Sequence, residues 1–154
     1  MGHYPAFICE NGHEISTFSR SCSDKYCKTC GAKVISSCPN CGATIKGRSD
    51  GDYGFLGSFG VPAYCPSCGK PYPWTSNAIQ ATIYMLEEED RISYEDRQKM
   101  IEVLPDIISE TPKTQLASIR YKRLVAIGGF VAEGLRDFAV NYACDLFRNF
   151  VDLP

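Results

Sequence analysis

Residues 27–42 read CKTCGAKVISSCPNCG and decide the fold, because they carry the same short motif twice. In each copy, two cysteines are separated by two residues and followed directly by a glycine, and a third copy begins at Cys65. Two thiolates at this spacing can bind one metal ion from a tight turn, and the glycine supplies the positive φ at the turn exit. The motif therefore predicts a zinc knuckle. The three pairs are Cys27/Cys30, Cys38/Cys41 and Cys65/Cys68, and their glycines are Gly31, Gly42 and Gly69.

A fourth half-site lies upstream of these three. Cys9 and His13 are four residues apart and bracket the turn-forming pair Asn11-Gly12. Four half-sites with two ligands each complete two tetrahedral sites, the coordination that structural zinc requires. We therefore predict two Zn²⁺ ions per chain. The ligands of the first site are Cys9, His13, Cys27 and Cys30, and those of the second are Cys38, Cys41, Cys65 and Cys68.

This sequential pairing is one of three arrangements of the half-sites. It leaves 13 residues between the half-sites of the first site and 23 between those of the second, which is room for a β-hairpin. A nested pairing must join Cys30 to Cys38 across only seven residues. A cross-brace pairing, as in RING domains, is geometrically open. The spacings favour the sequential arrangement.

The other cysteines and the second histidine are not needed for these sites. The total of nine cysteines is odd, and no secretory leader is visible, so a disulfide framework is disfavoured. Cys22 is interpreted as a spare thiol in a loop; the alternatives are a ligand that replaces His13 and a regulatory thiol. Cys144 is expected to be buried and inert, and His3 is not expected to be a ligand.

The composition is that of a soluble globular protein. Hydrophobic residues make up 44% of the 154 residues, and the formal net charge is −2. No global positive field therefore attracts nucleic acid. The apolar stretch 124–132 has nine residues, far below the roughly 20 that a membrane-spanning helix needs. We expect a cytoplasmic protein that does not bind a membrane.

We predict a small α+β fold in which residues 1–74 form a double zinc ribbon with short antiparallel strands. Apolar segments at 6–8, 34–35 and 43–45 flank the knuckles and are typical of strands. Residues 47–60 contain five glycines and are predicted to be a loop or a loose hairpin tip in the second ribbon. Three aromatic residues in this loop are a candidate binding surface, although covering the metal site is the simpler interpretation. They are Tyr53, Phe55 and Phe59, and the single tryptophan, Trp74, is expected to pack where the ribbon meets the first helix.

Residues 75–110 are predicted to form an acidic helical connector. They carry nine acidic and three basic residues, and helix formers begin at residues 75–76, which can cap the first helix. Ser93 is the expected N-cap of the next helix. Pro105 is expected to end or kink this helix. Thr111 is expected to cap a further helix whose first residue is proline.

Residues 111–154 are predicted to form one long amphipathic helix or a helical hairpin. The apolar seam runs from residue 116 to residue 150, longer than two small ribbons can cover. A glycine pair at 128–129 disfavours a helix by about 1 kcal/mol per glycine, so a kink there is the simplest expectation. We predict a homo-oligomer formed through this seam. The predicted interface residues are Leu124, Ile127, Val131, Leu135, Phe138 and Tyr142.

A basic cluster lies at the start of this segment and contains no acidic residue. It is a candidate phosphate-binding patch, but pairing with the acidic run 87–90 or with solvent is the favoured interpretation. The cluster consists of Lys113, Arg120, Lys122 and Arg123.

Several segments together carry a family resemblance. They are CENGH at 9–13, YCKTCGA at 26–32, CPNC at 38–41, AYCPSCGKPYPW at 63–74, TPKT at 111–114 and EGLRD at 133–137. With these segments the chain resembles an uncharacterised bacterial family of double-zinc-ribbon proteins, a domain of unknown function. The resemblance implies a bacterial, cytoplasmic setting and no established biochemical activity.

The function predicted from these features is a non-catalytic zinc-binding module that binds another protein and self-associates. All eight predicted ligands are protein side chains, whereas a catalytic zinc keeps one position open for water. With only two histidines in the chain, no nucleophile–base set is evident. The alternative is a nucleic-acid-binding zinc ribbon. The lysines among residues 25–48 support that alternative, and the negative net charge opposes it.

Overall fold

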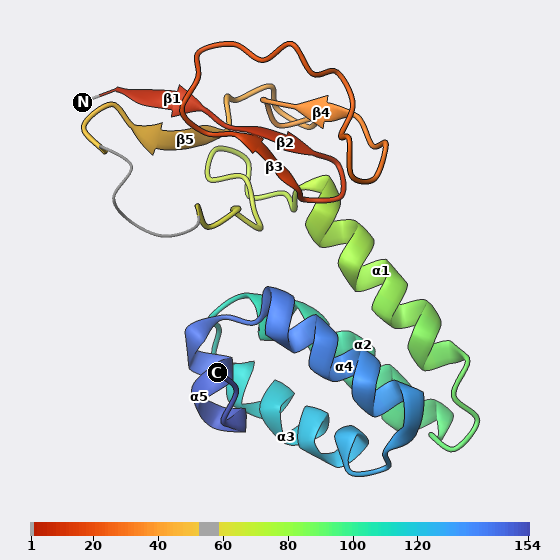
Figure 1. Cartoon of the computed structure of the whole chain (residues 1–154). Coiled ribbons are helices and arrows are strands. Elements are labelled where there is room, and N and C mark those ends of the chain that lie inside the picture. Colours follow the sequence, from red (N-terminus) through yellow and green to blue (C-terminus); the bar gives the residue numbers. More distant parts are fainter. Residues whose placement is uncertain (1, 53–58) are drawn as a thin grey trace. The chain divides into compact units, whose positions relative to one another are not determined.

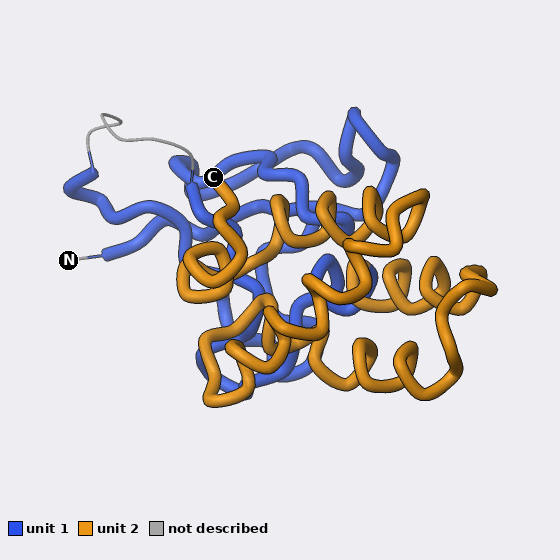
Figure 2. The backbone as a smooth tube through the Cα atoms, turned by 90° about the horizontal axis from the view of Figure 1, so that it is seen from below, with its two compact units in different colours: residues 1–77 blue, residues 78–154 orange. Residues whose placement is uncertain are grey.

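A computed structural model of the chain describes residues 2–52 and 59–154 (Figure 1). Over these residues the protein is a small α+β structure, as predicted, with short antiparallel strands followed by a helical C-terminal half. The chain forms two compact units, which Figure 2 colours separately. We call residues 1–77 the N-terminal unit and residues 78–154 the helical unit. The boundary falls within α1 (Pro73–Glu87).

The described strands form two small antiparallel sheets in the N-terminal unit. β2 (Phe7–Cys9) lies between β3 (Glu14–Ser16) and β4 (Val34–Ile35), and β1 (His3–Pro5) pairs with β5 (Lys46–Ser49). The strands predicted at 6–8 and 34–35 are confirmed to within a residue. The segment predicted at 43–45 contributes only a bridge, one of three that pair the chain on either side of a knuckle. These bridges are Tyr26–Lys33, Ser37–Thr44 and Tyr64–Pro71.

β5 corrects the prediction that residues 47–60 are all loop. Gly47 is buried in this strand, and a Cβ at this position would lie 2.9 Å from the backbone oxygens of both Tyr4 and Thr17. No side chain fits at that distance, so glycine is required for the neighbouring backbone to approach. The glycine therefore permits a strand pair here instead of marking a loop.

The core of the N-terminal unit is small and includes sulfur atoms. The Trp74 ring stacks on the Tyr72 ring with centroids 4.8 Å apart, and Trp74 Nε1 donates to the carbonyl oxygen of Pro62 at 2.8 Å. Trp74 therefore packs where the first helix begins, as predicted. α1 itself begins at Pro73, before the predicted cap, because proline suits the first helical position. The buried members of this core are Ala6, Ile8, Cys38, Ile45, Cys65, Tyr72 and Trp74.

The helical unit consists of the remainder of α1 and four further helices around an apolar core. They are α2 (Tyr94–Ile108), α3 (Thr114–Val125), α4 (Gly129–Tyr142) and α5 (Asp145–Val151). α3 contacts each of the other three, and α2 also contacts α4. The fully buried apolar residues of this unit include Leu86, Met100, Val103, Leu104, Ile107, Ala117, Val131, Leu135, Ala139 and Phe147.

Of the two alternatives expected for residues 111–154, one long helix is wrong, because the structure divides this segment into α3, α4 and α5. Gly128 and Gly129 adopt positive φ angles of 79° and 71°, which end the regular helical path. A second break follows α4, where Ala143 is extended with ψ at 140°. The chain folds back at both breaks, so its apolar seam is largely covered within the helical unit.

Pro105 lies inside α2, contrary to the expectation that it ends or kinks the helix near Leu104. Leu104 and Ile107 on either side of it are fully buried. Burial of this apolar face stabilises the helix beyond the proline, although one backbone hydrogen bond is lost. The N-cap prediction for Ser93 is confirmed, since its hydroxyl accepts a hydrogen bond from the backbone N–H of Asp96 at 3.1 Å.

Thr111 does not cap α3 directly. Its hydroxyl accepts from the backbone N–H of Lys113 at 3.0 Å and donates to Asp106 at 2.6 Å. α3 begins later, at Thr114. Thr111 thus closes a turn between α2 and α3, and the proline that follows it lies in this turn rather than at the first helical position.

Candidate metal centres

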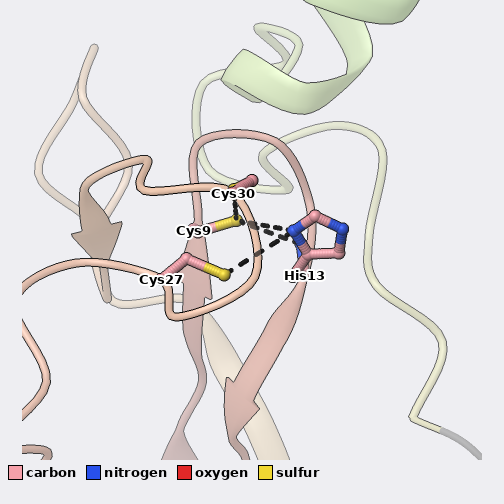
Figure 3. Close-up of side chains that lie close together, drawn as sticks. All are labelled: Cys9, His13, Cys27 and Cys30. Carbon is pink, nitrogen blue, oxygen red and sulfur yellow. Dashed lines mark hydrogen bonds between the residues drawn. The ribbon is translucent and has the colours of Figure 1, made fainter.

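Cluster one is formed by Cys9, His13, Cys27 and Cys30, whose donor atoms all lie within 4.8 Å of one another. The sulfur of Cys9 lies 3.4 Å from Nδ1 of His13 and 3.6 Å from the sulfur of Cys30. The sulfur of Cys27 lies 3.7 Å from the same nitrogen. Figure 3 shows these side chains turned toward one another from β2, from the turn that follows it and from the first knuckle. The imidazole therefore offers Nδ1 to a metal.

Cluster two is formed by Cys38, Cys41, Cys65 and Cys68, again with all donor atoms within 4.8 Å. The sulfurs of Cys38 and Cys68 are 3.8 Å apart, and those of Cys41 and Cys65 are 3.7 Å apart. The structure therefore groups the half-sites in sequence order. The cross-brace and nested pairings are not observed.

The same backbone turn presents the sulfurs of each knuckle. In the first knuckle, the N–H of Gly31 donates to the carbonyl oxygen of Cys27 at 2.7 Å, and the N–H of Cys27 donates to the carbonyl oxygen of Ala32 at 2.8 Å. The two other knuckles repeat this pattern. The predicted positive φ of the glycines is confirmed. These φ angles are 75° at Gly31, 78° at Gly42 and 73° at Gly69.

Both donor sets fit a tetrahedral metal ion. A zinc ion bound by sulfur at about 2.3 Å would separate its sulfur ligands by about 3.8 Å. The sulfur–sulfur distances of 3.6–3.8 Å in the two clusters match that spacing. Three thiolates with one imidazole, and four thiolates, are both donor sets of structural zinc sites. Each cluster can therefore bind one metal ion without a change of backbone.

Backbone N–H groups stabilise the thiolate form that a metal needs. The backbone N–H of Ala32 and the side chain of Asn11 donate to the Cys30 sulfur and lower the pKa of this thiol to about 6. Burial raises the pKa of Cys65, but the backbone N–H groups of Cys68 and Ser67 contribute to a net lowering to about 6. The knuckle turns thus prepare metal-binding thiolates.

The clusters cannot ionise fully without a cation. The backbone N–H of Ala43 lowers the pKa of Cys41, but burial and the three neighbouring sulfurs raise it to about 11 in the balance. Four thiolates held so close together repel one another, so the last one ionises only when positive charge enters the cluster. A divalent metal ion supplies that charge.

Two asparagines and a tyrosine extend the clusters, and the sequence analysis did not assign them a role. The side chain of Asn11 contacts the Cys30 sulfur, and that of Asn40 contacts the Cys68 sulfur. Each asparagine lies in the turn of one half-site and reaches the last cysteine of the same cluster. The Tyr72 hydroxyl contacts the Cys65 sulfur. Their contacts with the clusters could have been predicted from the sequence, because both asparagines lie inside the ligand motifs.

The remaining cysteines and His3 lie outside both clusters. The Cys22 sulfur donates to the carbonyl oxygen of Asp24 at 3.9 Å, so it does not replace His13. Cys144 is half-buried, not fully buried as expected, and precedes α5 as its N-cap residue. His3 lies in β1, where Nδ1 is 3.2 Å from the carbonyl oxygen of Gly47.

The predicted binding surface is not assembled as one site. Phe59 is half-buried and packs against the core that contains cluster two, which fits the covering role. Tyr53 and Phe55 lie outside the described residues. Lys113 and Arg120 both contact Glu102 of α2, at 3.5 and 3.3 Å, and not the acidic run 87–90. The two remaining basic residues are exposed and form no ion pair within the ranges 2–52 and 59–154: Lys122 and Arg123.

The residues predicted to form an oligomer interface are mostly covered by the helical unit. Four of the six are buried within the chain, so self-association is not needed to remove them from water. Ile127 is exposed, and the half-buried Tyr142 packs against Phe138 with ring centroids 5.4 Å apart. The four buried residues are Leu124, Val131, Leu135 and Phe138.

The fold and the two clusters define a small α+β protein with two sites that could each bind a metal ion. A family model described as "Uncharacterized protein conserved in bacteria (DUF2321)" matches residues 3–151. The chain therefore belongs to this bacterial family. No match was found among the curated proteins or among the solved structures. In the part of the chain that the structure describes, every helix is too short or too polar to cross a membrane.

Proposed function

We propose that the protein is a non-catalytic zinc-binding module that acts through macromolecular interaction, with one Zn²⁺ in each cluster. The observation that carries this proposal is the geometry of the two donor sets, each with four converging protein ligands. Thiolate-rich tetrahedral sets favour zinc among the abundant divalent ions. When bound, the zinc ions would cross-link the knuckles, so that residues 1–74 act as a double zinc ribbon.

The closed coordination supports a structural role for both ions. A catalytic zinc needs a position for water or substrate, whereas four protein ligands leave no such position. Three or four thiolates more than neutralise the charge that each ion would bring. The knuckles then present a rigid surface, and we propose that this surface binds a partner protein in the cytoplasm, where thiols remain reduced.

The helical unit is proposed to self-associate. The buried residues of the apolar seam 116–150 do not carry this proposal. It depends on apolar side chains that remain exposed on the described surface, among them Ile119 and Phe130. Exposed apolar groups of this size are common at interfaces between subunits.

Elemental analysis of the purified protein tests the metal part of this proposal. We expect two zinc ions per chain, and loss of one in each of the variants Cys27→Ser and Cys65→Ser. Iron in place of zinc, or one ion in the unmodified protein, would contradict the proposal. Binding to a generic oligonucleotide that weakens steeply with salt would instead favour the nucleic-acid alternative.

A further inference from the structure

A groove of about 430 Å³ lies in the helical unit between α2 and α3. Its floor comes from apolar side chains of α3, and its rim carries charged groups from both helices. The groove lies where α3 meets α2, and its lining includes Leu124, which is itself buried. The lining residues are Asp96, Lys99, Leu116, Ile119, Arg120, Arg123, Leu124 and Ile127.

The apolar floor of the groove is exposed to solvent. Leu116 is 39% exposed, Ile119 is 52% exposed and Ile127 is 36% exposed. Leu116 and Ile119 are three residues apart on one side of α3, and Ile127 lies in the turn that follows the helix. Covering such a side chain with a partner stabilises the complex by about 25 cal/mol per Å² of apolar area removed from water. The helical unit covers these three side chains only in part.

The rim of the groove carries one positive charge without a partner. Lys99 contacts Glu95 at 2.6 Å, and Arg120 contacts Glu102, so both of these charges are paired. Arg123 is exposed and, among the described residues, contacts no acidic side chain. An occupant of the groove is therefore expected to bring an acidic group to Arg123 together with an apolar group for the floor.

The same unit exposes a surface with that chemistry at the end of α1. Tyr84 is 60% exposed, and Glu87 and Glu88 are exposed three and four residues later, on the same side of the helix. Asp90 is exposed in the turn that follows. Within the described ranges, the three acidic side chains form no ion pair. We call Tyr84, Glu87, Glu88 and Asp90 the acidic face.

The acidic face lies next to one end of the groove. Arg91, directly after Asp90, donates to the carbonyl oxygens of Ile127 and Gly128 at 3.5 and 3.2 Å, and Ile127 lines the groove. Donor surface and receptor groove are therefore neighbours on one unit. A two-fold axis beside them would allow each chain to insert its acidic face into the groove of the other, which is a closed isologous contact.

We propose that the groove between α2 and α3 binds the acidic face of a second copy of this chain, in a symmetric dimer. Tyr84 would cover the apolar floor, and Glu88 would pair with Arg123. The proposal rests on the self-association part of the proposed function and names its surface. The interface then uses the part of the apolar seam that lines the groove, with Leu124 and Ile127, and not the buried residues of α4.

Sedimentation equilibrium of the zinc-loaded full chain tests the proposal. The unmodified protein is expected to dimerise at micromolar concentration, and Arg123→Glu is expected to weaken dimerisation at least about tenfold, since it places like charges together. The matched control is Lys122→Glu, which makes the same change of charge at an exposed neighbour outside the groove lining. This control should dimerise like the unmodified protein.

A charge exchange identifies the occupant. Glu88→Arg alone is expected to weaken dimerisation, and the double variant Glu88→Arg with Arg123→Glu is expected to restore it. A monomeric unmodified protein would overturn both this inference and the proposed self-association. A dimer that Arg123→Glu leaves unchanged, or that the double variant fails to restore, would overturn this inference alone. Zinc content and the helical circular dichroism signal should stay constant in every variant.

Discussion

The two units have the same length of 77 residues but are stabilised in different ways. The buried cluster of the N-terminal unit has seven members, and two of them are cysteines of cluster two. The helical unit instead buries whole faces of its helices, including Met100, Leu104 and Leu135. Short sheets of two and three strands bury little apolar area, so metal–ligand bonds of the proposed zinc sites would take the place of a larger core.

Removal of zinc should have the largest effect, because it should unfold one unit and leave the other folded. A chelator under reducing conditions should unfold residues 1–74, because structural zinc contributes on the order of 10 kcal/mol to folding in small zinc modules. The helical unit has no cluster of its own among the described residues and should keep its far-ultraviolet circular dichroism signal. Amide exchange measured by mass spectrometry would locate the loss. A single cooperative unfolding transition of both units would contradict the claim that they are stabilised in different ways.

The two clusters should also differ from each other. Cys65 is buried in the core beside Tyr72, whereas Cys30 is exposed at the protein surface. Cys65→Ser should therefore lower the midpoint of unfolding of the N-terminal unit more than Cys30→Ser does, although each variant loses one zinc ion. Thermal unfolding followed by the fluorescence of Trp74, which packs in the same core, measures this difference. Cys22→Ser is the control and should retain both zinc ions.

A cavity in the core of the helical unit should leave the metal content of the protein unchanged. Leu135 is fully buried in α4, and Leu135→Ala should lower the free energy of unfolding of the helical unit by about 3 kcal/mol. Zinc content should stay unchanged, because Leu135 belongs to the helical unit, whereas all eight cluster residues belong to the N-terminal unit. Leu116→Ala, on the exposed side of α3, should have a much smaller effect. Chemical denaturation followed by circular dichroism gives both values.

The smallest expected effect is a pH dependence of the helical unit. Arg91 donates hydrogen bonds to the Glu89 carboxylate and lowers its pKa to about 2. Since this pKa lies below the value of about 4.3 in an unfolded chain, the ionised pair stabilises the folded state at neutral pH. That contribution should disappear as the pH falls from about 4.5 toward 2.

Glu89→Gln provides the measurement. The unmodified protein should melt at a higher temperature than the variant at pH 7, and the difference should shrink at pH 3. Chelator present at both pH values ensures that acid release of zinc does not enter the comparison. An equal difference at both pH values would show that the Glu89–Arg91 pair is not the cause.

The local features of the fold could be predicted from the sequence. The spacing of two residues between cysteines sets the geometry of a knuckle, and the short distances along the chain favoured the sequential grouping of half-sites. The Ser93 cap likewise depends only on neighbours in the sequence. These features are fixed by contacts within a few residues, so their motifs are sufficient.

Features that depend on distant parts of the chain were missed. Gly47 is a strand residue because Tyr4 and Thr17 approach it from elsewhere in the sequence. Pro105 remains within a helix because burial on both sides of it outweighs a local penalty. The sequence left open whether the glycine pair at 128–129 kinks one helix or lies in a helical hairpin, and packing of α3 against α4 and α5 makes it a reversal.

The order of the ligands along the chain has a consequence for biosynthesis. All four ligands of cluster one, and the sheet of β2, β3 and β4 beside it, are complete once Ile35 has left the ribosome, before Cys38 emerges. If cluster one binds zinc as proposed, a nascent chain could bind that ion while the second cluster is still being translated. A cross-braced arrangement would hold unpaired thiols until both clusters could close together. Contiguous clusters shorten the time during which free thiolates are open to oxidation or to the wrong metal.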